Sequence, residues 1–100
     1  MARSTVRIHL DDWARHIALG PPPPGASSLH PSARAALEQA EPDPRAAPFR
    51  VVRCTVPEAR SLLDFFSSAA DALKGLGDPD ADVCAVARDR VRRAIVAAGA

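Results

Sequence analysis

The chain has little of several residue types that often carry a specific function. It contains no tyrosine, no asparagine, one tryptophan and a single lysine against twelve arginines. Such a bias is typical of a GC-rich coding sequence rather than of selection for one ligand, so the number of arginines alone is weak evidence for a binding site. The formal net charge is only +1, and a nearly neutral chain has no overall attraction to nucleic acid or to an anionic membrane. Binding to either would need a local cluster of basic side chains.

Long apolar segments are absent too. The sequence has no run of about 18 apolar residues, which a membrane-spanning helix needs, and its first residues lack the apolar stretch of a signal peptide. We therefore expect a cytoplasmic protein that makes no membrane contact. Its two cysteines, Cys54 and Cys84, are far apart and do not have the spacing of metal ligands, so we expect both thiols to be reduced.

The length and the available apolar residues limit the size of the core. A chain of 100 residues forms about one domain. Hydrophobic residues make up 47% of the sequence, but 21 residues are alanines, which predicts a thin core. We expect one small domain over residues 1–100, with proline-rich connectors at 20–31 and 41–48.

The N-terminal half predicts one strand and two short helices. Apolar and polar residues alternate in STVRIHL, which is typical of a strand with one buried face. Asp11 can cap a helix over 12–19. Trp13 and Ile17 share one face of this helix. After the consecutive prolines, HPSARAALEQAE predicts a second helix with a shallow stripe of alanines and Leu37.

The segment FRVVRCTV predicts a second strand, in which both faces carry apolar side chains. Val52, Cys54 and Val56 share one face because side chains alternate along a strand. Phe49 and Val51 lie on the other face. We therefore expect a more buried strand than the first, with the Cys54 thiol turned toward the core.

Two long helices follow this strand. Thr55 and Glu58 form a T-x-x-E capping box around a proline, which predicts a helix from about 56 to 74. The GLG segment then breaks the chain, and a final helix is expected from about 79 to 97. Because the connection is short, the two helices are expected to pack as an antiparallel hairpin.

Together these elements predict an α+β fold in the order β-α-α-β-α-α. The sheet would have two strands, or be completed by a second copy of the chain. An isolated pair of strands is marginally stable, and exposed strand edges favour pairing with a protein partner or in a homodimer. Phe65 lies off the main apolar stripe of its helix, so it is our candidate contact for such a partner. The alternative places Phe65 beneath the proline-rich segment of its own chain.

Two groups of residues have the chemistry of catalytic or metal sites. Cys54 precedes a helix N-terminus, a position that can lower the pKa of a thiol, but its inward parity favours a buried structural cysteine. His9, Asp12 and His16 lie close together in the sequence, although their spacing matches no zinc signature. Their convergence on a metal stays open. We expect no cofactor and no enzymatic activity.

The densest positive charge lies in ARDRVRRAI, which contains Arg88, Arg90, Arg92 and Arg93. A basic helix can bind phosphate groups. At helical spacing Arg88 and Arg92 fall near one edge of the polar face and Arg90 near the other. Asp89 is spaced to pair with Arg93. Nucleic-acid binding through these arginines is therefore an alternative function.

The favoured function is a small noncatalytic protein-interaction or regulatory module that self-associates. It would present its helical hairpin and a strand edge to a protein partner. The alternative is a nucleic-acid-binding accessory protein that uses the arginine-rich C-terminal helix. An enzyme that uses Cys54 or the histidine cluster is the third hypothesis.

Overall fold

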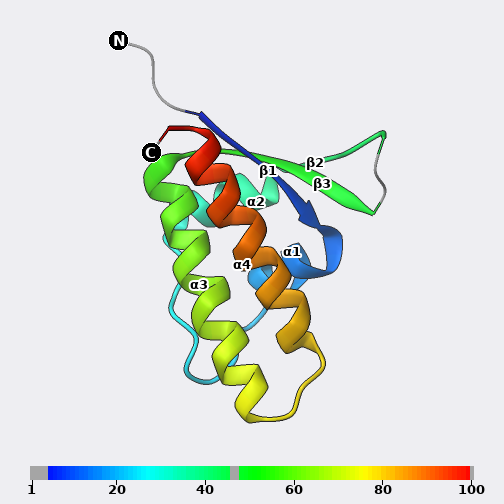
Figure 1. Ribbon diagram of the computed structural model, residues 1–100, viewed down its shortest axis with the longest axis vertical. Coiled ribbons are helices and arrows are strands. Elements are labelled where there is room, and N and C mark those ends of the chain that lie inside the picture. Colours follow the sequence, from blue (N-terminus) through cyan, green and yellow to red (C-terminus); the bar gives the residue numbers. More distant parts are fainter. Residues whose placement is uncertain (1–4, 46–47, 100) are drawn as a thin grey trace.

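The computed structural model describes residues 5–45 and 48–99, and its architecture is the α+β fold that the sequence predicts (Figure 1). In chain order, the elements are β1 (Thr5–Asp11), α1 (Asp12–Leu19), α2 (Pro31–Glu38), β2 (Glu41–Pro42), β3 (Phe49–Thr55), α3 (Val56–Gly75) and α4 (Asp80–Ala97). The strands form one antiparallel sheet in the order β1-β3-β2. The helices pack against one face of this sheet, and α3 and α4 form the expected hairpin.

The third strand, β2, is a feature that the sequence did not predict. It occupies Glu41–Pro42, which we had assigned to the second connector, and it pairs with Arg50 and Val51 of β3. The Asp43 backbone N–H donates to the Phe49 carbonyl at 2.9 Å and extends this contact. A proline is tolerated here because β2 is an edge strand, where its missing N–H breaks no ladder. The first residues of the predicted connector therefore enlarge the sheet.

The two faces of the sheet differ sharply in character. The inner face carries the buried side chains of Val6, Ile8, Leu10, Val52 and Cys54. The opposite face carries the exposed polar side chains of β1 and, on β3, the half-buried Phe49 and Val51 with the exposed Arg53, because residues alternate between the two faces of a strand. We call this second side the open face of the sheet.

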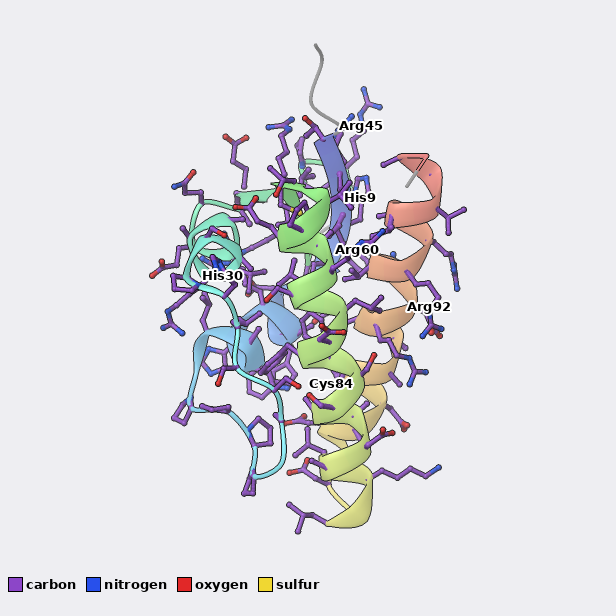
Figure 2. The ribbon with its side chains drawn as sticks, turned by 90° about the vertical axis from the view of Figure 1, so that its left-hand side faces the viewer. His9, His30, Arg45, Arg60, Cys84 and Arg92 are labelled. Atoms are coloured by element: carbon purple, nitrogen blue, oxygen red, sulfur yellow. The ribbon has the colours of Figure 1, made fainter. Side chains whose placement is uncertain are left out.

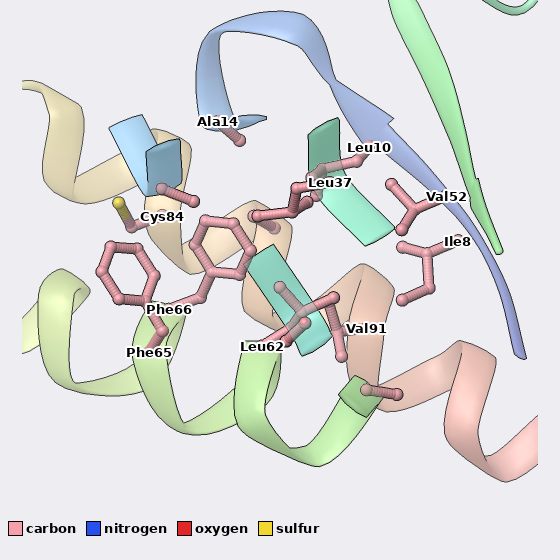
Figure 3. Packing of buried hydrophobic residues seen from close by; sticks show 14 of the residues in the cluster. Ile8, Leu10, Ala14, Leu37, Val52, Leu62, Phe65, Phe66, Cys84 and Val91 are labelled. Carbon is pink, nitrogen blue, oxygen red and sulfur yellow. The ribbon is translucent and has the colours of Figure 1, made fainter. Parts of the chain in front are cut away.

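The core lies between the inner face and the helical hairpin (Figure 3). Phe65 and Phe66 both project into it from α3, with ring centroids 5.3 Å apart in an edge-to-face arrangement. Our expectation that Phe65 lies partly outside the core is wrong, because only 1% of its surface is exposed. It is therefore not available to a partner.

The proline-rich connector lies along α3 on both sides of Phe65, since the His30 backbone N–H donates to Ser61 Oγ at 2.9 Å, which agrees with the alternative that this segment covers Phe65. The Ser27 backbone N–H donates to Ser68 Oγ at 2.7 Å, and a Cβ added to Gly25 would lie 3.7 Å from Ala72 Cβ. The connector ends one residue earlier than predicted, because Pro31 already occupies the first turn of α2. Proline is favoured there since its ring fixes a helical φ and the missing N–H has no partner in the first turn.

The short helix α1 contributes less to the core than its large side chains suggested. Ala14 and Ala18 are its buried residues, whereas Trp13 is 50% exposed and donates its indole N–H to Asp80 Oδ1 at 2.9 Å. Trp13 thus tethers α1 to the start of α4. The predicted cap is confirmed, because Asp11 Oδ1 accepts a hydrogen bond from the Trp13 backbone N–H at 2.8 Å.

The capping box of α3 is present as predicted, and it yields the first testable expectation. Glu58 Oε1 accepts from the Thr55 N–H at 2.8 Å, and Thr55 Oγ1 accepts from the Glu58 N–H at 3.4 Å. We expect Thr55→Ala to lower the free energy of unfolding by about 0.5–2 kcal/mol, because one N–H of the first turn loses its partner. Urea denaturation measures this change. Thr55→Ser retains the hydroxyl and is the matched control, so an equal loss in both variants would contradict the capping role.

Candidate binding surface

The open face of the sheet places two like charges directly opposite each other. In the register of β1 and β3, Arg7 pairs with Arg53. Both side chains are exposed, and within residues 5–45 and 48–99 neither forms an ion pair. Like charges at directly opposed positions destabilise a sheet. This pair therefore lowers the stability of the fold slightly.

A hollow of about 490 Å³ lies over this face. Arg7, His9, Val51 and Arg53 form its floor and the segment 41–45 forms its wall. His9 Nδ1 lies 3.1 Å from Asp43 Oδ2. Figure 2 shows His9 and Arg45 at the same end of the molecule. The backbone N–H of Arg45 and, to a smaller extent, His9 hold the pKa of the Asp43 carboxyl below its ordinary value. One acid of the wall is thus already engaged within the chain.

A second hollow of about 260 Å³ continues the first around the edge of β1. It is lined by Arg7, His9, Arg90, Arg93, Ala94 and Ala97. Since Arg7 and His9 line both hollows, the two form one continuous surface. We name its five arginines, which come from three separate parts of the chain, the arginine face: Arg7, Arg45, Arg53, Arg90 and Arg93.

Arg90 is the most enclosed member of the arginine face. Its guanidinium carbon lies 4.5 Å from the centroid of the Phe49 ring, which is cation–π geometry. Its Nε is buried and has no hydrogen-bond acceptor among the residues that the structure describes. A buried donor without an acceptor is costly, so the enclosed position of Arg90 lowers the stability of the fold.

The four arginines of α4 do not form a single patch. Arg88 and Arg92 lie 3.3 and 3.7 Å from Asp89 Oδ1. The predicted pair between Asp89 and Arg93 is wrong, because no contact within 4 Å joins them, and Arg93 instead faces β1. The helix therefore contributes only Arg90 and Arg93 to the arginine face.

The two thiols are structural in their placement. Cys54 lies on the inner face of the sheet and Cys84 on the inner side of α4, and both are buried and unbridged. Burial raises the pKa of each thiol to about 11. A thiol with such a pKa is almost entirely protonated at neutral pH and is a poor nucleophile.

We accordingly expect slow labelling of both thiols in the native protein. Reaction with a thiol reagent at neutral pH should follow the rate at which the core opens, because the thiolate is both scarce and inaccessible. The same protein in denaturant is the control and should react at the rate of a free cysteine peptide. Rapid native labelling of Cys54 would show that its pKa is low and would revive the nucleophile hypothesis.

The residues of the possible metal site each have a different partner. His9 contacts Asp43, and Asp12 forms an ion pair with Arg50. His16 stacks on Trp13 with ring centroids 5.0 Å apart. In the described part of the chain, no three side chains of metal-ligand type come together.

One polar cluster was not anticipated from the sequence. His30, Ser32 and Glu58 line a hollow of about 630 Å³ between α2 and α3. His30 Nδ1 lies 2.8 Å from Ser32 Oγ and also accepts from the Ser32 backbone N–H at 3.2 Å. The Thr55 backbone N–H lowers the pKa of the Glu58 carboxyl. These bonds cap the first turns of α2 and α3, which accounts for the cluster without catalysis.

Comparison with protein families, curated proteins and solved structures found no significant match to this chain. Within the described ranges, every helix is too short or too polar to cross a bilayer.

Proposed function

We propose that this protein is a small noncatalytic interaction module that binds an acidic protein partner through the arginine face. The observation that carries the proposal is the cross-strand pair of Arg7 and Arg53, neither of which forms an ion pair within the described residues. Local features that lower stability are commonly retained where they serve function. An acidic partner would neutralise both guanidinium groups and remove their repulsion.

The shape of the surface also supports a binding role. Arg7 and Arg53 stand on adjacent strands, and Arg90 and Arg93 stand on a long helix, so rigid elements hold these four charges. The two hollows make this surface concave rather than flat. Charge complementarity at such a surface steers association and selects the partner.

Nucleic-acid binding is the second candidate, and the gathering of basic side chains on one surface favours it. The set differs from the one expected from the sequence, because Arg7 and Arg53 join Arg90 and Arg93 while Arg88 and Arg92 pair with Asp89. We rank it second because the hollow over the sheet also contains Glu41 and Asp43. These carboxylates interrupt the positive surface, which disfavours a continuous row of phosphates, whereas an acidic protein can place its separate carboxylates beside the arginines.

A capture experiment tests the proposed function. The tagged wild-type protein and the double variant Arg7→Glu, Arg53→Glu are used to isolate partners, and co-eluting protein and nucleic acid are both identified. We expect an acidic protein that the wild type retains and the double variant loses. Lys74→Glu is the matched control, because it reverses a charge at the end of α3, and the turn between α3 and α4 lies far from the sheet (Figure 1). Equal retention by all three proteins would contradict a role for the arginine face, and nucleic acid retained only by the wild type would promote the second candidate.

Self-association and a cytoplasmic location belong to the same proposal. Two reduced thiols fit a reducing compartment. A homodimer cannot use the arginine face symmetrically without bringing like charges together, so it would use a different surface. Sedimentation velocity over a range of concentrations tests for the homodimer.

A further inference from the structure

We propose that the partner contributes an extended acidic segment, which pairs as an additional strand with the free edge of β1 and lies in the groove between β1 and α4. This inference rests on the proposed function and specifies how the acidic partner is bound.

The free edge of β1 is the first observation. Over residues 5–45 and 48–99, the strand order β1-β3-β2 makes β1 an edge strand that is paired on one side only. Among the described residues, no hydrogen bond from outside the sheet reaches the backbone of residues 5–10. An edge of this kind carries a row of unpaired N–H and C=O groups, onto which an extended peptide can add as a strand.

The composition of the groove is the second observation. The α4 side presents Arg90 and Arg93 together with Ala94 and Ala97. The alanines are small, so they obstruct a peptide backbone beside the strand less than larger side chains would. In Figure 1 the C-terminal half of α4, orange to red, passes beside β1, blue, and the helix packs on this strand. A segment added to β1 would therefore lie against the helix.

The charge of the groove selects the sequence of the segment. Its lining includes three arginines and His9 but no acidic residue. Side chains of an added strand alternate between the two faces of the sheet. The residues that point to the open face would meet Arg7 and Arg93, which favours aspartate or glutamate at every second position. The residues between them would turn toward the inner side, which favours apolar side chains because the inner face of β1 is apolar.

Other occupants fit this groove less well. A second copy of β1 would bring another Arg7 to a surface that already holds Arg7, Arg90 and Arg93, so its charge opposes self-pairing. A nucleic acid could contact the arginines, but it has no regular row of amide groups to match the strand edge. An acidic peptide satisfies both the charges and the backbone.

The test uses the full chain and a synthetic peptide of alternating glutamate and valine, matched in length to β1. A second peptide has the same side chains but carries a methyl group on every backbone nitrogen, which removes the N–H donors and preserves the charge. In NMR titrations of the ¹⁵N-labelled protein, we expect the unmethylated peptide to shift the amide signals of β1 and of 90–97. It should also slow hydrogen exchange on β1. We expect the methylated peptide to bind at least about tenfold more weakly, a difference of about 1.4 kcal/mol in binding free energy.

Two variants make the result specific to the groove. Arg93→Glu should abolish binding of the unmethylated peptide, whereas Arg93→Lys should retain most of it because the charge is kept. Far-ultraviolet circular dichroism verifies that both variants are folded. Equal loss in the two variants would overturn the charge argument.

The remaining outcomes separate this inference from the proposed function. Equal affinity for the two peptides would overturn strand addition but leave an acidic partner on the arginine face. Tighter binding of single-stranded oligo(dT) than of the peptide would overturn the choice of a peptide. Failure of the unmethylated peptide to bind at all would overturn the inference, while the capture experiment would still decide the proposed function independently. If the protein formed a dimer that Arg93→Glu disrupted, the groove would be the binding site for a second copy of the chain instead.

Discussion

Phe65→Ala should lower the free energy of unfolding by about 3–5 kcal/mol, because a fully buried aromatic side chain is replaced by a cavity. The ring is 1% exposed and meets Phe66 edge to face in the core beside the hairpin. A loss of this size removes a large part of the roughly 5–15 kcal/mol that stabilises a domain. Urea denaturation, followed by circular dichroism, measures the loss.

Val96→Ala is the control for this substitution. Val96 also lies in the helical hairpin, but 69% of its surface is exposed. We expect a change within about 0.5 kcal/mol for this surface position. Should Phe65→Ala prove too unstable to purify, Phe65→Leu keeps most of the apolar volume and should show a smaller loss of the same sign. A Phe65→Ala variant as stable as Val96→Ala would mean that Phe65 is not a core residue.

Arg53→Glu should change stability and binding in opposite directions. The substitution places a carboxylate directly opposite Arg7 and converts a repulsive pair into an attractive one. We expect the free energy of unfolding to rise by about 0.2–1 kcal/mol. We expect affinity for an acidic partner to fall by about tenfold or more, because one favourable charge is lost and a repulsive one is added. Denaturation and titration of the same protein preparation measure the two effects.

Two further variants serve as controls for these changes in stability and binding. Arg53→Gln removes the repulsion without adding a negative charge, so it should give a smaller gain in stability and a smaller loss of binding. Lys74→Glu reverses a charge far from the sheet and should leave binding unchanged, but it should lower stability because it removes the favourable positive charge from the C-terminus of α3. A fall in stability for Arg53→Glu would show that Arg53 supports the fold and that its position opposite Arg7 has no cost.

The parts of the fold that depend on neighbouring residues could be predicted from the sequence. Asp11 caps α1, and the Thr55–Glu58 capping box begins α3, because caps are formed by residues only two or three positions apart. The alternation in β3 placed Val52 and Cys54 in the core for the same local reason. The helical hairpin followed from two periodic segments and a short connection.

The features that depend on distant contacts could not be predicted. The pairing of Glu41 with Val51 is what defines β2, and a proline-rich segment gives no local signal for it. The burial of Phe65 depends on residues of other elements that meet α3. Trp13 bonds to Asp80, 67 positions away, instead of filling the core.

The candidate surface was missed for the same physical reason. Arg7 and Arg53 lie far apart in the sequence, and only the strand register makes them neighbours. The sequence drew attention to the dense arginines of α4, but Arg88 and Arg92 there are paired with Asp89. Parity did indicate that Arg7 faces away from the apolar side chains of its own strand, and that Arg53 lies on the opposite face from Val52 and Cys54. Parity identifies exposed residues, but it does not predict which strands pair or in which register.

The most direct test of the arginine face is an NMR titration of the ¹⁵N-labelled full chain with poly-L-glutamate at low and high salt. At low salt, we expect the largest shifts at Arg7, Arg53, Arg90 and Arg93 and their neighbours. These shifts should diminish at high salt, because exposed charges are then screened. Shifts centred on Arg34 and Arg60, which are exposed arginines outside the arginine face, or no shifts at low salt, would contradict the assignment of this surface as the binding site.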